Sequence, residues 1–132
     1  MARHVVAPVA DIPPGARRLV EAGGKRIVVF NLGGEFFALG DRCPHQGGPM
    51  HKGAVMGLVE SPCPGAYSYE RTGEIIRCPW HAWEFDIRTG RSRVDPRRTK
   101  LRAYPAAVAN GAALRAETLE VRVEESYVVV EV

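Results

Sequence analysis

The chain lacks the features that mark membrane proteins and disulfide-stabilised secreted proteins. Its 132 residues contain no run of 18 apolar residues, which a membrane-spanning helix requires. The N-terminal segment has no apolar signal core and soon reaches Pro13-Pro14-Gly15. Cysteine is scarce and odd in number, at three residues, which makes a poor disulfide framework. We therefore expect a cytoplasmic protein with reduced thiols and no membrane partner.

Acidic side chains are nearly missing from one segment, whose positive charge exceeds the net charge of the whole chain. The formal net charge is +3, yet residues 88–102 carry seven basic side chains and a single acid, Asp95. A basic segment can bind nucleic acid, but this one lacks the interleaved aromatic residues that stack on bases. A solvated strand and loop is the favoured reading, docking to an acidic protein is an intermediate one, and no nucleic-acid partner is expected.

No long helical pattern, internal repeat, low-complexity tract or interdomain linker is present, and short β-strands dominate instead. The expected strands 26–32 and 35–39 flank a Gly33-Gly34 turn, which predicts a hairpin. The expected strands 119–123 and 127–132 flank residues 124–126 and predict a second hairpin. An alanine-rich segment, 106–117, predicts a helical turn that Asn110-Gly111 interrupts. The pattern predicts a single all-β domain over residues 1–132. The expected strands are 26–32, 35–39, 74–77, 83–87, 101–104, 119–123 and 127–132.

Two short Cys/His pairs, Cys43-Pro44-His45 and Cys78-Pro79-Trp80-His81, are the main chemical signal. Each proline fixes its own φ and pushes the preceding cysteine toward an extended conformation. The remaining loop amides can then donate hydrogen bonds to cysteine sulfur, which tunes an iron–sulfur centre. Two thiolates and two imidazoles suit either one zinc ion or a two-iron cluster with sulfur ligands on one iron and nitrogen ligands on the other.

The two pairs resemble the signature of the Rieske [2Fe–2S] domain, and so does the longer string from Cys78 to Arg91. The resemblance covers most of the chain. It implies that Cys43 and Cys78 bind one iron and that His45 and His81 bind the other, in loops at about 41–52 and 76–85. It also implies an antiparallel β sandwich or barrel with a small two-loop cluster-binding subdomain. A Cys₂His₂ zinc-stabilised binding module stays as an alternative, although zinc fingers favour another ligand order.

The family resemblance implies a soluble one-electron carrier, similar to the ferredoxin component of Rieske-type oxygenase systems. Its expected partners are a flavoprotein reductase and a terminal oxygenase or other redox protein. The chain is not expected to be an enzyme, because Rieske oxygenases need a further iron on two histidines and a carboxylate. Only His4 and His51 remain here, and His51 is read as a surface residue. An accessory subunit of a nitrite-reductase-type enzyme is a second alternative.

Several positions depart from other Rieske subclasses. Gly48 and Trp80 stand where respiratory members carry a loop-linking disulfide, and Ala82-Trp83 follows His81 where high-potential members have a serine. With fewer donors to the cluster, we expect a reduction potential on the order of −150 mV. Residues 59–73 read as an inserted loop or hairpin, with the spare Cys63, and Ala82 replaces a usual glycine. We expect Trp83 to pack in the core or loops and leave the role of Trp80 open.

Overall fold

The computed structural model describes the chain except Met1 and residues 45–46, 64–65, 81–82, 94–96, 98 and 116–120. For residues 57–63 and 66–72 it describes the backbone alone. The chain divides into two compact units, which we call the terminal unit (Met1–Ala38 with Tyr104–Val132) and the central unit (Leu39–Ala103). No helix in the described part is long and apolar enough to cross a membrane.

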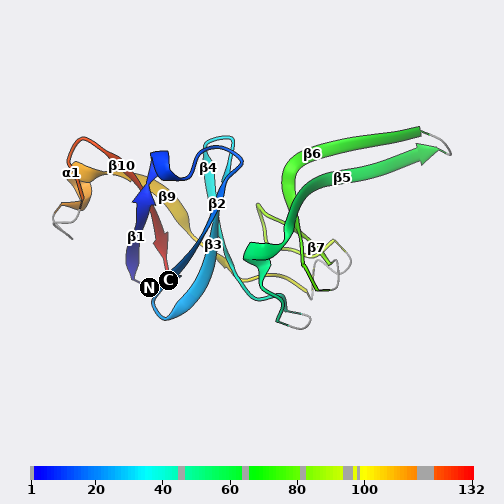
Figure 1. Ribbon diagram of the computed structural model, residues 1–132, viewed down its shortest axis with the longest axis horizontal. Coiled ribbons are helices and arrows are strands. Elements are labelled where there is room, and N and C mark those ends of the chain that lie inside the picture. The colour runs from blue at the N-terminus through cyan, green and yellow to red at the C-terminus, as the bar shows by residue number, and fades with distance from the viewer. Residues whose placement is uncertain are drawn as a thin grey trace. The chain divides into compact units, whose positions relative to one another are not determined.

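The terminal unit is built on two sheets, and every strand pairing given for it is antiparallel (Figure 1). The first sheet has the order β1-β10-β9, and the second has the order β2-β3-β4-β8, in which β4 and β8 run across the boundary of the two units. A short 3-10 turn, Val9–Asp11, follows β1. The strands are β1 (Arg3–Pro8), β2 (Arg17–Ala22), β3 (Lys25–Leu32), β4 (Glu35–Gly40), β8 (Ala103–Tyr104), β9 (Ala106–Asn110) and β10 (Ser126–Glu131).

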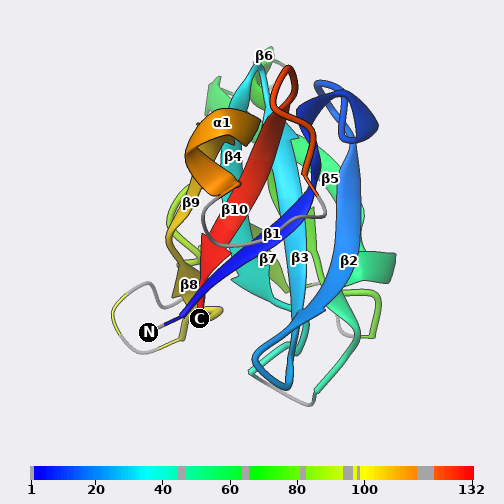
Figure 2. The same ribbon diagram turned by 90° about the vertical axis from the view of Figure 1, so that its left-hand side faces the viewer.

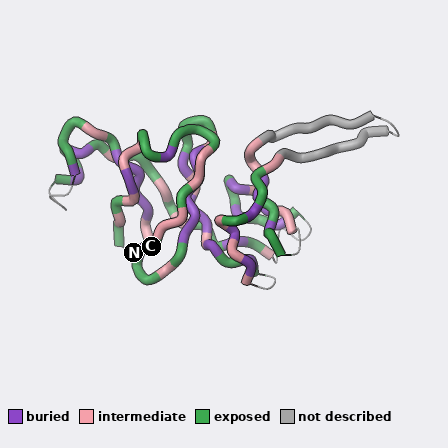
Figure 3. The backbone as a smooth tube through the Cα atoms, in the orientation of Figure 1, coloured by how far each residue is buried: buried purple, intermediate pink, exposed green. Residues whose placement is uncertain are grey.

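Strand β10 is buried on both faces, which explains its unbroken apolar run. Val128 and Val130 belong to a core cluster that joins residues of both sheets. Tyr127 and Val129 point to the opposite face, where they pack with Leu114 and Val121, because successive side chains alternate across a strand. The short helix α1 (Gly111–Leu114) lies over this face of β10 (Figure 2). Buried residues also fill most of β3 (Figure 3).

The predicted all-β fold is confirmed, but the predicted final hairpin is wrong. The described part of the expected 119–123 strand, residues 121–123, lies in bends and turns, and β10 pairs with β1 and β9 instead. The backbone N–H of Arg122 donates to the Tyr127 hydroxyl at 2.7 Å, so this segment bonds to a side chain rather than to a strand. The alanine-rich segment begins as β9 and becomes helical at Gly111, where Asn110 caps α1 by accepting from the Ala113 N–H at 2.8 Å.

The central unit holds the third sheet, in the order β5-β6-β7, and both predicted ligand loops. Strands β5 (Ala54–Cys63) and β6 (Ala66–Arg77) pair as a long antiparallel hairpin, seen as a two-stranded ribbon in Figure 1. This hairpin spans the segment where an insertion was predicted. Strand β7 (Glu84–Asp86) pairs with the last three residues of β6. The first loop therefore leads into β5, and the second connects β6 to β7.

Candidate metal centre

The first ligand loop folds back on itself around Cys43. The Cys43 N–H donates to the Gly48 carbonyl at 2.9 Å, and the Gly47 N–H donates to the Cys43 carbonyl at 2.7 Å. Arg42 and Pro49 form an isolated antiparallel bridge outside this pair of bonds. The backbone of the loop is thus closed on both sides of the cysteine, whose side chain is only 1% exposed.

A clamp made by Asp41 and His51 closes the base of this loop. The Asp41 carboxylate accepts hydrogen bonds from the His51 backbone N–H at 2.7 Å and from the His51 ring at 2.8 Å through Nδ1. The Asp41 carbonyl accepts from the Met50 N–H at 2.7 Å. Because a carboxylate is an acceptor, the proton of this contact lies on Nδ1. The clamp ties the start of the loop to the 3-10 turn Met50–Lys52 that ends it.

His51 was predicted to be a surface residue, and the structure corrects this. Its side chain is 21% exposed and lies against a carboxylate that is 7% exposed. A buried carboxylate loses hydration and needs hydrogen-bond donors in exchange. The sequence shows an acid two residues before Cys43 and a histidine at the end of the loop. Their spacing alone does not show that the two side chains are in contact.

The second ligand loop places Cys78 at the end of β6. Its N–H donates to the Trp83 carbonyl at 2.8 Å, so the turn that contains the pair closes on itself. The Cys78 side chain is 1% exposed, whereas Trp80 is 57% exposed. Trp83 is half-buried, in line with the expected packing role. His45, His81 and Ala82 lie outside the described residues.

Two glycines let the ligand loops approach each other. A Cβ at Gly48 would lie 2.8 Å from the Cys78 Sγ and 3.2 Å from the Trp80 ring. A Cβ at Gly53 would collide with the carbonyl oxygen of Arg77. Side chains at these positions would force the loops apart, so the first loop lies directly against the second at Cys78.

The residues present fit a thiolate-bound centre. Cys43 and Cys78 carry thiols rather than a disulfide, and both are buried, which shields sulfur ligands from water. Among the described residues, no group of three or more His, Cys, Asp and Glu side chains gathers. Of the predicted set of four ligands, the structure describes the two sulfur donors, Cys43 and Cys78. The two nitrogen donors, His45 and His81, lie outside the described part.

Loss of the His51 ring should destabilise the central unit. His51→Leu removes the ring donor and leaves Asp41 only partly satisfied, so we expect the free energy of unfolding in urea to fall by about 1–3 kcal/mol. His51→Asn keeps a side-chain N–H donor and should lose less than half of that. Equal losses in the two variants would show that the clamp contributes nothing beyond packing.

A methyl group at Gly48 should disturb the metal centre more than the fold. Gly48→Ala crowds the Cys78 Sγ at a cost of roughly 1–3 kcal/mol, which corresponds to about a 5- to 150-fold loss of iron retention against a chelator. Gly40→Ala is the matched control, because its Cβ would meet Arg102 at an ordinary 3.7 Å. Equal iron release from both variants would contradict the close approach.

Comparison with known proteins agrees with this geometry. The model of the Rieske [2Fe–2S] domain matches residues 2–105. The ferredoxin subunit of 3-phenylpropionate/cinnamic acid dioxygenase from Escherichia coli (strain K12) is 32% identical over 111 residues, which cover 84% of this chain and 90% of that protein. Both matches are long enough to include the two Cys/His loops.

Solved structures share the fold over nearly the whole chain. A ferredoxin from Sphingomonas yanoikuyae B1 superposes with a TM-score of 0.65 at 22% identity and covers 99% of each chain. The ferredoxin of carbazole 1,9a-dioxygenase from Nocardioides aromaticivorans IC177 gives a TM-score of 0.61 at 21% identity and covers 97% of each chain. These likenesses confirm the predicted antiparallel β fold. The chain belongs to the Rieske [2Fe–2S] domain family, as an electron-transfer protein whose cofactor is a [2Fe–2S] cluster and not as an enzyme in its own right.

Proposed function

We propose that this chain holds its cluster through Cys43, His45, Cys78 and His81 and carries single electrons from a flavoprotein reductase to a terminal oxygenase. The observation that carries the ligand proposal is the contact between the two loops at Gly48 and Cys78. It brings one buried cysteine of the set against the loop that contains the other. The order of ligands in the sequence, one cysteine and one histidine per loop, supports the same set.

A bound [2Fe–2S] cluster supplies reversible one-electron transfer. The residues of this chain set the conditions for it. The closed backbone around Cys43 and the turn around Cys78 keep both thiols out of water. The Asp41–His51 clamp fixes the ends of the first loop, so the loop keeps its shape when the charge of the centre changes.

The choice of partners rests on the relatives. The Escherichia coli relative is named as the ferredoxin subunit of a dioxygenase, which favours an oxygenase as electron acceptor over a nitrite-reductase-type assembly. A flavoprotein reductase fits as donor because it splits electron pairs into single electrons. We place this exchange in the cytoplasm. A Cys₂His₂ zinc module is the remaining alternative for the four ligands, and the family membership disfavours it.

Ligand variants test the assignment. The purified protein should contain two irons and two sulfides per chain and give the EPR signal of a reduced Rieske centre. Cys78→Ser and His81→Ala should each abolish that signal, whereas Cys63→Ser should keep it. Circular dichroism on the same samples separates loss of a ligand from loss of the fold. Colourless protein with one zinc, or a native signal in His81→Ala, would overturn the proposal.

The reduction potential tests the proposed place in the electron path. With Ala82-Trp83 after His81 and no disulfide position in the loops, few donors reach the cluster, so we expect a midpoint on the order of −150 mV. A redox titration followed by EPR measures it. Trp83→Ser introduces the hydroxyl of higher-potential members and should raise the midpoint, with Trp83→Ala as the control that adds no donor. A wild-type midpoint well above zero would contradict this place in the path.

A further inference from the structure

The exposed charges on the two ligand loops all have the same sign. Segments 41–53 and 77–83 contain three cationic side chains, Arg42, Lys52 and Arg77, and one acid, Asp41. The three cations are exposed. Asp41 is buried and bonded to His51. The loops thus present positive charge to solvent without an exposed carboxylate to offset it.

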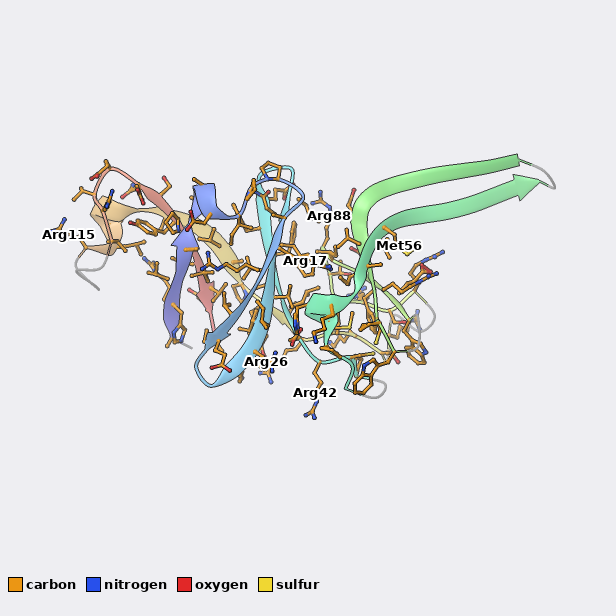
Figure 4. All side chains as sticks on the ribbon, in the orientation of Figure 1. Arg17, Arg26, Arg42, Met56, Arg88 and Arg115 are labelled. Carbon is orange, nitrogen blue, oxygen red and sulfur yellow. The ribbon has the colours of Figure 1, made fainter. Side chains whose placement is uncertain are left out.

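An exposed indole and one of these cations flank two adjacent glycines of the first loop. The Arg42 Nε is 3.1 Å from a Cβ built at Gly47, and the Trp80 ring is 3.2 Å from a Cβ built at Gly48. The same Gly48 position is 2.8 Å from the Cys78 Sγ. Arg42 and Trp80 therefore border two adjacent glycines, of which Gly48 lies directly against the Cys78 sulfur. The Arg42 side chain points away from the ribbon in Figure 4.

Two acidic side chains of the central unit are already ion-paired. Glu74 accepts from Arg88 at 2.7 Å, and Glu84 accepts from Arg93 at 3.0 Å. Over the whole unit, residues 39–103 hold eleven basic and seven acidic side chains. Such an excess produces a positive potential that attracts acidic surfaces.

We propose that Arg42, Lys52, Arg77 and Trp80 form a docking face for an acidic surface on the electron acceptor, with an apolar hollow that receives the Trp80 indole. This inference rests on the proposed carrier function and adds the chemistry of the partner. The cations steer the encounter, since complementary charge mainly raises association rates. The indole supplies the buried anchor, because tryptophan is enriched among residues that dominate interface energies. The site of contact then lies beside Gly48, which lies against the Cys78 sulfur.

Small redox ions test the sign of the charge. The dithionite-reduced protein is oxidised in a stopped-flow instrument by ferricyanide, an anion, or by hexaamminecobalt(III), a cation. We expect the ferricyanide rate to fall with added salt and the hexaamminecobalt(III) rate to rise. Arg42→Glu should lower the ferricyanide rate roughly tenfold at low salt and less than about twofold at 0.5 M salt, where exposed charges are screened.

A control variant separates local charge from net charge. Arg115 is exposed and follows α1 in the terminal unit, and its side chain is labelled in Figure 4. Arg115→Glu changes the net charge by the same amount as Arg42→Glu without touching the ligand loops. We expect it to change the ferricyanide rate by less than about twofold. Equal slowing by both variants would overturn the proposed docking face.

An acidic protein acceptor tests the indole. Oxidised cytochrome b5, whose haem edge is surrounded by carboxylates, serves as the probe, and NMR shifts of the loop amides report binding without electron transfer. We expect Trp80→Ala to weaken binding roughly tenfold, which is the scale of a buried aromatic contact, and Trp80→Phe to restore most of it. A binding affinity that depends neither on Trp80 nor on the salt concentration would contradict the proposal.

The outcomes also distinguish this inference from the carrier function. A protein without a reversible one-electron signal fails as a carrier, whatever its surface does. A normal signal with rates that do not depend on Arg42 refutes the docking face alone. Duplex DNA is the competing occupant. Tight DNA binding at 0.15 M salt that is lost in Arg42→Glu would assign this face to nucleic acid and overturn the acidic-protein proposal.

Discussion

The close approach of Gly48 to the Cys78 sulfur is the constraint on which the proposed metal centre depends. The loops come from separate parts of the chain, and each is closed by its own backbone hydrogen bonds. They meet only because Gly48 and Gly53 carry no Cβ. The approach of the loops places the buried Cys78 sulfur against the loop that contains the buried Cys43.

Local hydrogen bonds rather than regular structure hold the first loop. In the described part of residues 41–53 the chain has one short 3-10 turn and an isolated bridge. Its shape comes from a side chain, Asp41, that accepts from the far end of the same loop. A loop held by a hydrogen-bonded clamp at its base can present its middle to the proposed metal centre and to a partner while its ends stay fixed. This arrangement agrees with the general placement of functional groups on loops over a rigid scaffold.

The sequence predicts the chemistry of this protein better than its strand order. The Cys/His pairs and the string after Cys78 are local patterns, so they can be recognised in the sequence without any knowledge of the fold. The strands β3 and β4 can also be predicted from the sequence, because their apolar runs flank a glycine turn. The strands β1 and β2 are not predicted, because each begins with basic residues and keeps only a short apolar run. The expected partner of β10 is wrong because pairing is a long-range property, and the hydroxyl of Tyr127 takes the bond that a strand would have taken. The Asp41–His51 contact likewise joins residues across a loop whose path the sequence does not reveal.

The hairpin β5–β6 has a consequence for how this fold varies. Its base is a three-stranded segment, where Ile75, Ile76 and Arg77 pair with β5 on one side and β7 on the other. Beyond that base only two strands pair with each other. Since the side-chain period of a strand is two, equal additions of two residues to each strand preserve the face of every residue at the base. The hairpin can therefore change its length in such steps while the ends of β5 and β6, and with them the loops of Cys43 and Cys78, stay in register.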